Sequence, residues 1–159
     1  MKLLVLSDSH SSLRFMRLCM DKIKPDGVIH LGDYYDDGEV LKEEYPNVLF
    51  RQVPGNCDRF RCPPYVQEIL IDRIFGVDFY LTHGHHHSPD NLPPLPQGTV
   101  FLSGHTHVKL DKTEGGIRCL NPGSVSIPKE DSWHGYMTLE DGHFRWMDFD
   151  GACHREYQA

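Results

Sequence analysis

The sequence lacks any long apolar run. No segment approaches the roughly 18 consecutive apolar residues of a membrane-spanning helix. The apolar start, residues 1–6, is too short and too quickly followed by Asp8 to be a secretory signal peptide. We therefore expect a cytoplasmic protein with no membrane partner. Internal repeats and low-complexity segments are also missing, and 159 residues are within what one hydrophobic core can hold. A single domain over residues 1–159 is predicted.

Cysteine occurs in an odd number and at irregular spacing: the chain has Cys19, Cys57, Cys62, Cys119 and Cys153. Only Cys57 and Cys62 are close enough in sequence to suggest a pair, and thiols stay reduced in the cytoplasm. We therefore interpret all five as free thiols. A structural zinc site fits poorly, because such sites favour four closely spaced Cys and His ligands.

The chain has fewer positively charged than negatively charged residues. The chain has 16 Lys and Arg against 23 Asp and Glu, which gives a formal net charge of −7. Non-specific binding to nucleic acid is not expected, because it needs basic patches. A phosphate substrate remains possible, since bound divalent cations would reverse the sign of the field locally. Composition leaves the oligomeric state open.

What the sequence does have is a repeated local pattern, in which a short apolar segment runs into side chains that can bind metal. This happens five times, at Asp8-Ser9-His10, Gly32-Asp33, Gly55-Asn56-Cys57-Asp58, Thr82-His83-Gly84-His85 and Gly104-His105-Thr106-His107. A single His-x-His pair could simply alternate between the two faces of a strand. In an open α/β sheet, however, ligands bind beyond the carboxyl ends of the strands. Five such ends together predict one metal site.

The apolar segments also predict the order of the elements. Helices are expected at residues 13–23 and 38–45. Strands are expected at residues 2–7, 28–31, 48–53, 66–71, 77–81, 100–102, 108–113, 117–120, 135–139 and 143–149, with 152–157 as a candidate last strand. Early β-α-β units followed by late hairpins favour two sheets packed face to face with helices outside. The proline-rich segment 86–98 is expected to be a surface loop beside the site.

Taken together and in this order, the motifs resemble those of the calcineurin-like metallophosphoesterases, and more narrowly their small bacterial phosphodiesterase branch. The segment Asn121-Pro122-Gly123-Ser124, continuing to Lys129, belongs to the same pattern. The resemblance spans residues 1 to about 140. It implies an α/β fold, a four-layer α/β/β/α sandwich with two packed mixed sheets.

The resemblance also implies a ligand set for two divalent ions. Asp8, His10 and His107 would hold one ion. Asn56, His83 and His105 would hold the other. Asp33 would bridge them. The ions of such centres lie about 3.5–4 Å apart.

The mixture of carboxylate, imidazole and amide oxygen ligands suits borderline divalent metals. We expect Mn²⁺, with Fe²⁺, Zn²⁺, Ni²⁺ and Mg²⁺ as alternatives. The implied reaction is phosphodiester hydrolysis of a small phosphate-ester substrate by in-line attack of a metal-bridging hydroxide. The loop 121–125 is predicted to support His105 and His107 from below.

Three further residues are candidate catalytic groups. Cys57 stands where many relatives carry a histidine near the leaving group, and its thiol could either donate a proton weakly or only pack. Asp58 is predicted to orient a neighbouring histidine. His85, the second histidine of the Thr-His-Gly-His motif, could either touch substrate or lie in solvent.

The roles of several neighbours stay open. Arg59 and Arg61 could clamp a phosphate or belong to a solvated loop. Tyr34 and Tyr35 could stack on an aromatic substrate or only pack. We interpret His86 and His87 as solvated loop residues, and His30 as a histidine of the core.

Two alternatives to a phosphodiesterase are retained. One is a phosphomonoesterase acting on a small phosphorylated metabolite. The other is a non-catalytic metal-binding scaffold, because the retromer subunit that shares this fold serves protein contacts and fold does not fix function.

Overall fold

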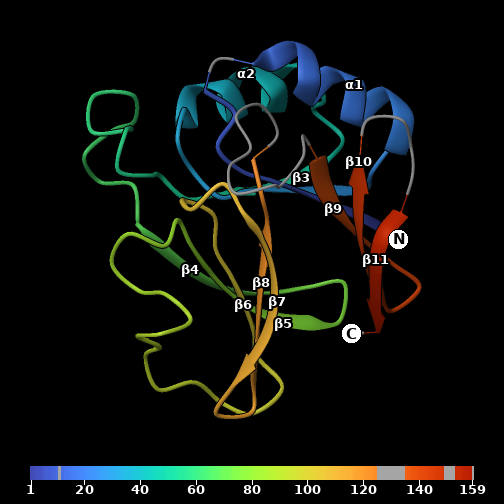
Figure 1. Ribbon diagram of the computed structural model, residues 1–159. Helices are drawn as coiled ribbons and strands as arrows, with labels where there is room; N and C mark the ends of the chain where they lie inside the picture. The colour runs from blue at the N-terminus through green and yellow to red at the C-terminus, as the bar shows by residue number, and fades with distance from the viewer. Residues whose placement is uncertain (11, 125–134, 149–152, 159) are drawn as a thin grey trace.

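A computed structural model of the protein describes residues 1–10, 12–124, 135–148 and, as backbone, 153–158. Two mixed β-sheets pack face to face, and both helices lie on the outer face of the first sheet (Figure 1). Neither helix in this part of the chain is long and apolar enough to span a membrane. The later part of the predicted motif, residues 125–129, lies outside the described residues.

The first sheet combines parallel strands from the N-terminal part with antiparallel strands from the C-terminal part. Its order is β11-β10-β9-β1-β2-β3. The strands are β1 (Lys2–Leu6), β2 (Gly27–His30), β3 (Leu49–Gln52), β9 (Gly135–Glu140), β10 (His143–Asp148) and β11 (Cys153–Gln158). The helices, α1 (Leu13–Ile23) and α2 (Tyr35–Glu44), connect the three parallel strands.

Strand β1 is buried on both faces, as its uninterrupted apolar sequence predicts. Because side chains alternate along a strand, Leu3 and Val5 join the core between the sheets. Leu4 and Leu6 instead pack under the helices, against residues such as Met16. One strand therefore belongs to both hydrophobic cores.

The second sheet has the order β4-β5-β6-β8-β7. Its strands are β4 (Ile69–Ile74), β5 (Val77–Thr82), β6 (Val100–Leu102), β7 (Lys109–Glu114) and β8 (Ile117–Pro122). Strands β5, β6 and β8 are parallel, while β4 and β7 are antiparallel edges.

The two packed mixed sheets of the predicted fold class are confirmed. In the described residues, however, the fourth layer contains no helix. Tyr80 and Phe101 on the outer face of the second sheet are covered by Leu92 and Leu95 instead. These leucines come from the proline-rich loop, which is too interrupted by proline to form a helix.

Three predicted boundaries are wrong by three residues each. Strand β4 begins at Ile69 rather than residue 66, and it extends to Ile74 because the turn is only Phe75-Gly76, both with positive φ. Helix α2 begins at Tyr35 rather than residue 38. The carboxylate of Asp58 accepts the Tyr34 and Tyr35 N–H groups at 2.6 and 2.8 Å, so a distant segment supplies the cap.

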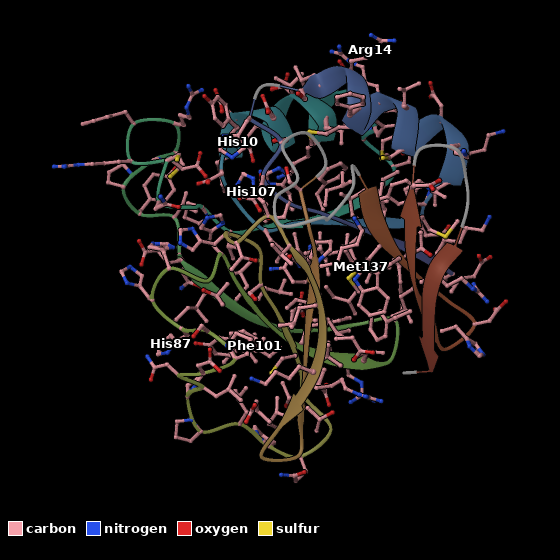
Figure 2. The ribbon with its side chains drawn as sticks, in the orientation of Figure 1. His10, Arg14, His87, Phe101, His107 and Met137 are labelled. Carbon is pink, nitrogen blue, oxygen red and sulfur yellow. The ribbon has the colours of Figure 1, made fainter. Side chains whose placement is uncertain are left out.

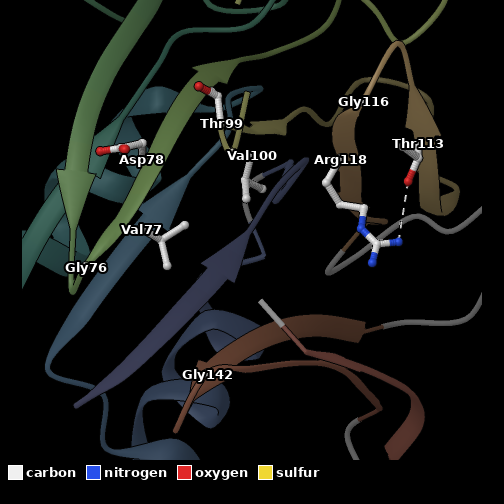
Figure 3. A pocket seen from close by; sticks show the side chains of 10 residues that line it. Gly76, Val77, Asp78, Thr99, Val100, Thr113, Gly116, Arg118 and Gly142 are labelled. Atoms are coloured by element: carbon white, nitrogen blue, oxygen red, sulfur yellow. Dashed lines mark hydrogen bonds between the residues drawn. The ribbon is translucent and has the colours of Figure 1, made fainter. Parts of the chain in front are cut away.

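A pocket of about 470 Å³ lies at the end of the second sheet where β5 and β6 begin, away from the ends that carry the motifs. Figure 3 shows Asp78 and Arg118 at its wall. Asp78 pairs with Arg73 at 3.0 Å, and Arg118 donates to Thr113 at 3.4 Å. Among the described residues, no histidine or cysteine lines this pocket.

Phe79 offers a test of the packing between the sheets. It is fully buried in β5 and meets Phe144 of β10 edge to face, with ring centroids 6.3 Å apart. Phe79→Ala should lower the free energy of unfolding by about 3–5 kcal/mol in urea denaturation, because it leaves a cavity between two sheets. Ile71→Ala, at a side chain that is 76% exposed, is the control and should change it by less than about 0.5 kcal/mol. Equal effects of the two variants would contradict this packing.

Candidate metal centre

The carboxyl ends of the parallel strands bring the seven predicted ligands together. Asp8 and His10 follow β1, Asp33 follows β2, and Asn56 follows β3. His83 follows β5, and both His105 and His107 follow β6. Figure 2 shows His10 and His107 side by side, although one comes from each sheet.

The backbone at these positions is unusual. Asp8, His10, Asp33, His105 and His107 all have positive φ, between 44 and 70°. A non-glycine residue in this left-handed region costs roughly 1–2 kcal/mol. Such strain persists where the surrounding structure enforces it, and it concentrates at functional sites. Five of the seven candidate ligands therefore occupy backbone conformations that favour a function over simple packing.

One half of the centre contains Asp8, His10, Asp33 and His107, whose ligand atoms all lie within 4.8 Å of one another. His107 Nε2 is 3.2 Å from Asp8 Oδ1 and 3.3 Å from His10 Nε2. The other oxygen of Asp8, Oδ2, accepts the Ser7 hydroxyl and the His105 N–H. Asp8 is thus held by one oxygen and faces the histidines with the other.

The other half contains Asn56, His83 and His105. Asn56 Oδ1 is 3.0 Å from His83 Nε2 and 3.1 Å from His105 Nδ1, and the two ring nitrogens are 3.2 Å apart. Three potential ligand atoms therefore point at one place.

Asp33 lies between the halves. Its Oδ2 is 3.6 Å from His10 Nε2 and 3.4 Å from His83 Nε2, and its Oδ1 accepts the Cys57 N–H at 3.0 Å. Burial alone would raise the pKa of Asp33, but the hydrogen bond and charge of His83 outweigh it and lower the pKa well below the usual range. The carboxylate is therefore charged at neutral pH, as its predicted bridging role requires.

The tautomer of His83 tests whether the site fits a metal. Its Nδ1 is 2.7 Å from the Leu31 carbonyl oxygen, to which it must donate, so Nε2 is the atom that faces the centre. Burial lowers the pKa of His83, but the Asp33 hydrogen bond and the charges of Asp8 and Asp33 raise it overall. Binding of a metal would remove the proton from His83 Nε2 and use the lone pair that is left there. Carboxylate, imidazole and amide oxygen donors packed this closely fit divalent metals.

Two other histidines of the centre, His10 and His105, have a lowered pKa, which favours the neutral form. Burial lowers the pKa of His10, against the raising effect of Asp33 and Asp8. Burial and the neighbouring His83 lower the pKa of His105. Neutral imidazole is the form that binds metal.

Surrounding residues hold the motif loops, and Asn121, at the end of β8, gives the support that was predicted for the segment it begins. Asn121 Nδ2 donates to the Gly104 carbonyl oxygen at 2.9 Å and to Thr106 Oγ1 at 3.2 Å. Gly104 must be glycine, since a Cβ there would lie 1.9 Å from Ser7 Oγ.

His30 is fully buried, as predicted for a core histidine, and burial lowers its pKa to about 4. Its Nδ1 is 3.3 Å from the Gly32 N–H, and its Nε2 is 3.0 Å from Ser9 Oγ. Ser9 Oγ in turn donates to Asp37 of α2 at 2.8 Å. This chain of hydrogen bonds ties the loops that carry Asp8 and Asp33 to the helix.

The prediction for Asp58 is wrong. Both of its oxygens bind backbone N–H groups, those of Tyr34, Tyr35 and Gly55, and in the described residues it forms no hydrogen bond with a histidine ring. Because Asp58 is fully buried, these donors satisfy its charge. Asp58 fixes the loops of Asp33 and Asn56 rather than a ligand ring.

Cys57 is exposed beside the centre, with its Sγ 3.9 Å from Asn56 Nδ2. Desolvation and the negative charge of Asp33 raise the pKa of its thiol, so the protonated form prevails at neutral pH. With Cys19, Cys62 and Cys119 it is among the free cysteines of the described side chains.

The remaining candidates surround the centre. The Arg61 guanidinium lies 3.8 Å from the centre of the Tyr34 ring and pairs with Asp36 at 3.1 Å, while the Tyr34 ring lies 5.1 Å from the His10 ring. Arg59 lies over the exposed ring of Phe60, at 5.3 Å.

Of the histidines after His83, His85 lies 5.5 Å from the His83 ring and is half-buried. His87 lies apart, against Tyr80 (Figure 2). His86 pairs with Glu68, a residue that the sequence pattern did not single out. The hairpin register could have revealed it, because Ile69 pairs with Thr82 and places the residue before β4 beside the residues that follow β5.

Comparison with known proteins gives the family. The model of the calcineurin-like phosphoesterase superfamily domain matches residues 1–141. The chain belongs to this superfamily. Phosphodiesterase YfcE of Escherichia coli is 32% identical over 165 aligned residues, which cover 89% of this chain and 88% of that protein. A probable metallophosphoesterase of Mycoplasma pneumoniae is 32% identical over 138 residues, covering 80% and 81%.

Solved structures agree with this assignment. The structure of the E. coli phosphoesterase YfcE has a TM-score of 0.86 at 26% identity and covers 99% of both chains. The predicted resemblance to the small bacterial phosphodiesterase branch is confirmed. Vps29 of Entamoeba histolytica, solved with Zn²⁺, shares the fold alone, with a TM-score of 0.66 at 20% identity over 99% of both chains.

Asp58→Asn should show how much the centre depends on this buried carboxylate. The amide can accept from fewer of the three N–H groups, so the free energy of unfolding should fall by about 1.5–3 kcal/mol. Metal affinity, measured by isothermal titration, should fall with it because the Asn56 loop loosens. Asp90→Asn, at a side chain that is 87% exposed, is the control. Unchanged stability and metal affinity in Asp58→Asn would rule out this role.

Proposed function

We propose that the protein is a dinuclear metal-dependent phosphodiesterase. The observation that carries the proposal is the convergence of two sets of three ligand atoms on either side of Asp33. Asp8, His10 and His107 form one set, and Asn56, His83 and His105 form the other. The names of the relatives, a phosphodiesterase and a probable metallophosphoesterase, support a phosphoester hydrolase.

The charge balance supports binding of an anionic substrate. Two divalent ions carry four positive charges, and the centre offers two carboxylates, Asp8 and Asp33. The loaded centre is therefore positive by about two units, although the whole chain carries −7. When bound, the two ions supply Lewis acidity and make hydroxide available from water near neutral pH for in-line attack on phosphorus.

The chain's own groups orient the reaction. Asp33 holds both ligand sets in register, and the contact of its Oδ1 with the Cys57 N–H places the thiol beside the centre. Cys57 is exposed and protonated, so it can donate a proton to a leaving oxygen. On the other side, Tyr34 stands against His10 and is covered by the Arg61 guanidinium. We assign this pair to the part of the substrate that lies beyond the phosphate.

The preference for a diester is the finer part of the proposal. A monoester carries nearly two negative charges near neutral pH, and a positive centre alone would hold it more tightly than a diester with one. The support for a diester comes from the phosphodiesterase relative and from a thiol, which pairs with a second phosphate charge less well than imidazolium. The alternative of a non-catalytic scaffold is less well supported, because all seven candidate ligands are present and five hold strained backbone conformations.

Metal removal and a substrate panel test the function directly. Chelation should abolish hydrolysis of a phosphodiester, and Mn²⁺ should restore it best. In the substrate panel, the diester should be hydrolysed faster than the matched monoester at equal metal concentration and pH. Asp33→Ala should lose metal from both positions, since its carboxylate faces both. Full activity in chelator would end the metal proposal, and faster monoester turnover would end the diester preference.

Cys57→Ala separates proton donation from packing. If the thiol protonates the leaving oxygen, hydrolysis of an alkyl ester should slow by about 10²-fold, while a nitrophenyl ester, whose leaving group needs no proton, should be unaffected. Cys62→Ala is the matched control, since Cys62 is a free thiol in the same loop whose Sγ contacts the Asp58 carbonyl oxygen at 3.5 Å. Equal rates for Cys57→Ala and the parent across leaving groups would remove the thiol from the mechanism.

A further inference from the structure

A second group of metal-capable side chains lies beside the centre described above. Glu68, His85 and His86 each offer one ligand atom, and these atoms lie within 4.8 Å of one another. Glu68 Oε2 is 3.0 Å from His86 Nε2, and Glu68 Oε1 is 4.0 Å from His85 Nε2. The two imidazole rings have centroids 4.1 Å apart.

The hairpin of the second sheet creates this group. Glu68 directly precedes β4, and the pairing of Ile69 with Thr82 sets it opposite the chain that leaves β5. The turn after His83 then brings His85 and His86 toward the carboxylate of Glu68. Gly84 permits this turn with a φ of 116°, a conformation that side-chain-bearing residues rarely adopt.

The ligand chemistry indicates which ion would bind. Two histidines and one glutamate form the three-ligand set of open zinc sites, which keep a fourth position for water or substrate. Ligands about 2.1 Å from a tetrahedral ion lie about 3.4 Å apart, which falls between the 3.0 and 4.0 Å observed here. Small side-chain rotations would therefore suffice.

A simple ion pair accounts for less of the arrangement. Glu68 and His86 have side chains that are 54% and 57% exposed, and exposed pairs contribute little stability. Such a pair also leaves His85 unexplained, although its half-buried ring lies close to that of His86. A shared cation explains why all three side chains turn to one point.

We propose that Glu68, His85 and His86 bind one further divalent ion of the Zn²⁺ class, with an open coordination position toward solvent. The His85 ring is 5.5 Å from that of His83 and 6.3 Å from that of His105. The ion would therefore add positive charge on the Asn56 side of the centre, where a second anionic group of a substrate could contact it.

The experiment counts ions rather than activity. Metal-free protein is dialysed against a series of Zn²⁺ concentrations, and bound zinc per chain is measured for the parent and for a Glu68→Gln, His86→Ala double variant. The double variant should bind one zinc ion fewer per chain at saturation. Both substituted side chains are more than half exposed, so the fold should persist, and circular dichroism checks this.

His87→Gln is the matched control, because His87 follows the cluster directly but packs against Tyr80. It should bind as much zinc as the parent. Equal zinc saturation in the parent and a folded double variant would overturn the proposal. The difference between the two proteins does not depend on how many ions the main centre holds, so failure here is distinct from failure of the proposed phosphodiesterase function.

Discussion

The carboxylate of Asp33 is the contact on which the rest of the centre depends. It follows a strand of the first sheet, and its Oδ2 faces His10 from that sheet and His83 from the other. The two ligand sets can share this carboxylate only if both sheets present the carboxyl ends of their parallel strands at one edge. The hydrophobic core between the sheets enforces that alignment, with β1 contributing to it through Leu3 and Val5. Packing far from the chemistry thus fixes distances of a few ångströms within it.

Strain and rigidity are linked at this edge. Five candidate ligands have left-handed backbone conformations, which folding must stabilise from elsewhere. Hydrogen bonds from buried side chains provide that stabilisation. Asp58 binds three N–H groups of two loops, Asn121 holds the loop between β6 and β7, and His30 connects through Ser9 to α2. A site held in this way is preorganised, so little reorganisation is needed when charge enters it.

The sequence predicted what depends on local pattern. Apolar segments that end in ligand-capable residues located the strands and brought all seven candidate ligands to one edge, because the carboxyl ends of parallel strands meet there. Prediction from the sequence failed where a segment distant in the chain sets the position of a residue or the start of an element. The start of α2 is set by the Asp58 carboxylate, which lies more than a helix length away in the chain, and Glu68 joins its histidines only through the register of β4 and β5. Neither contact leaves a periodic signal. In the described residues no helix covers the second sheet, because Leu92 and Leu95, which cover Tyr80 and Phe101, come from a loop that its prolines keep irregular.

The fold and the ligand set carry different information about function. One fold can serve many unrelated functions, so the sandwich alone does not specify a reaction. A positive centre alone is equally unselective, because it attracts any phosphate. Selectivity must therefore come from groups outside the seven candidate ligands, and the described structure places three kinds of them around the centre. A protonated thiol lies at Cys57, and the Tyr34 ring lies between His10 and Arg61. The group formed by Glu68, His85 and His86 lies beside His83. Each belongs to a loop that follows a strand, so each can change without disturbing the core that aligns the ligands.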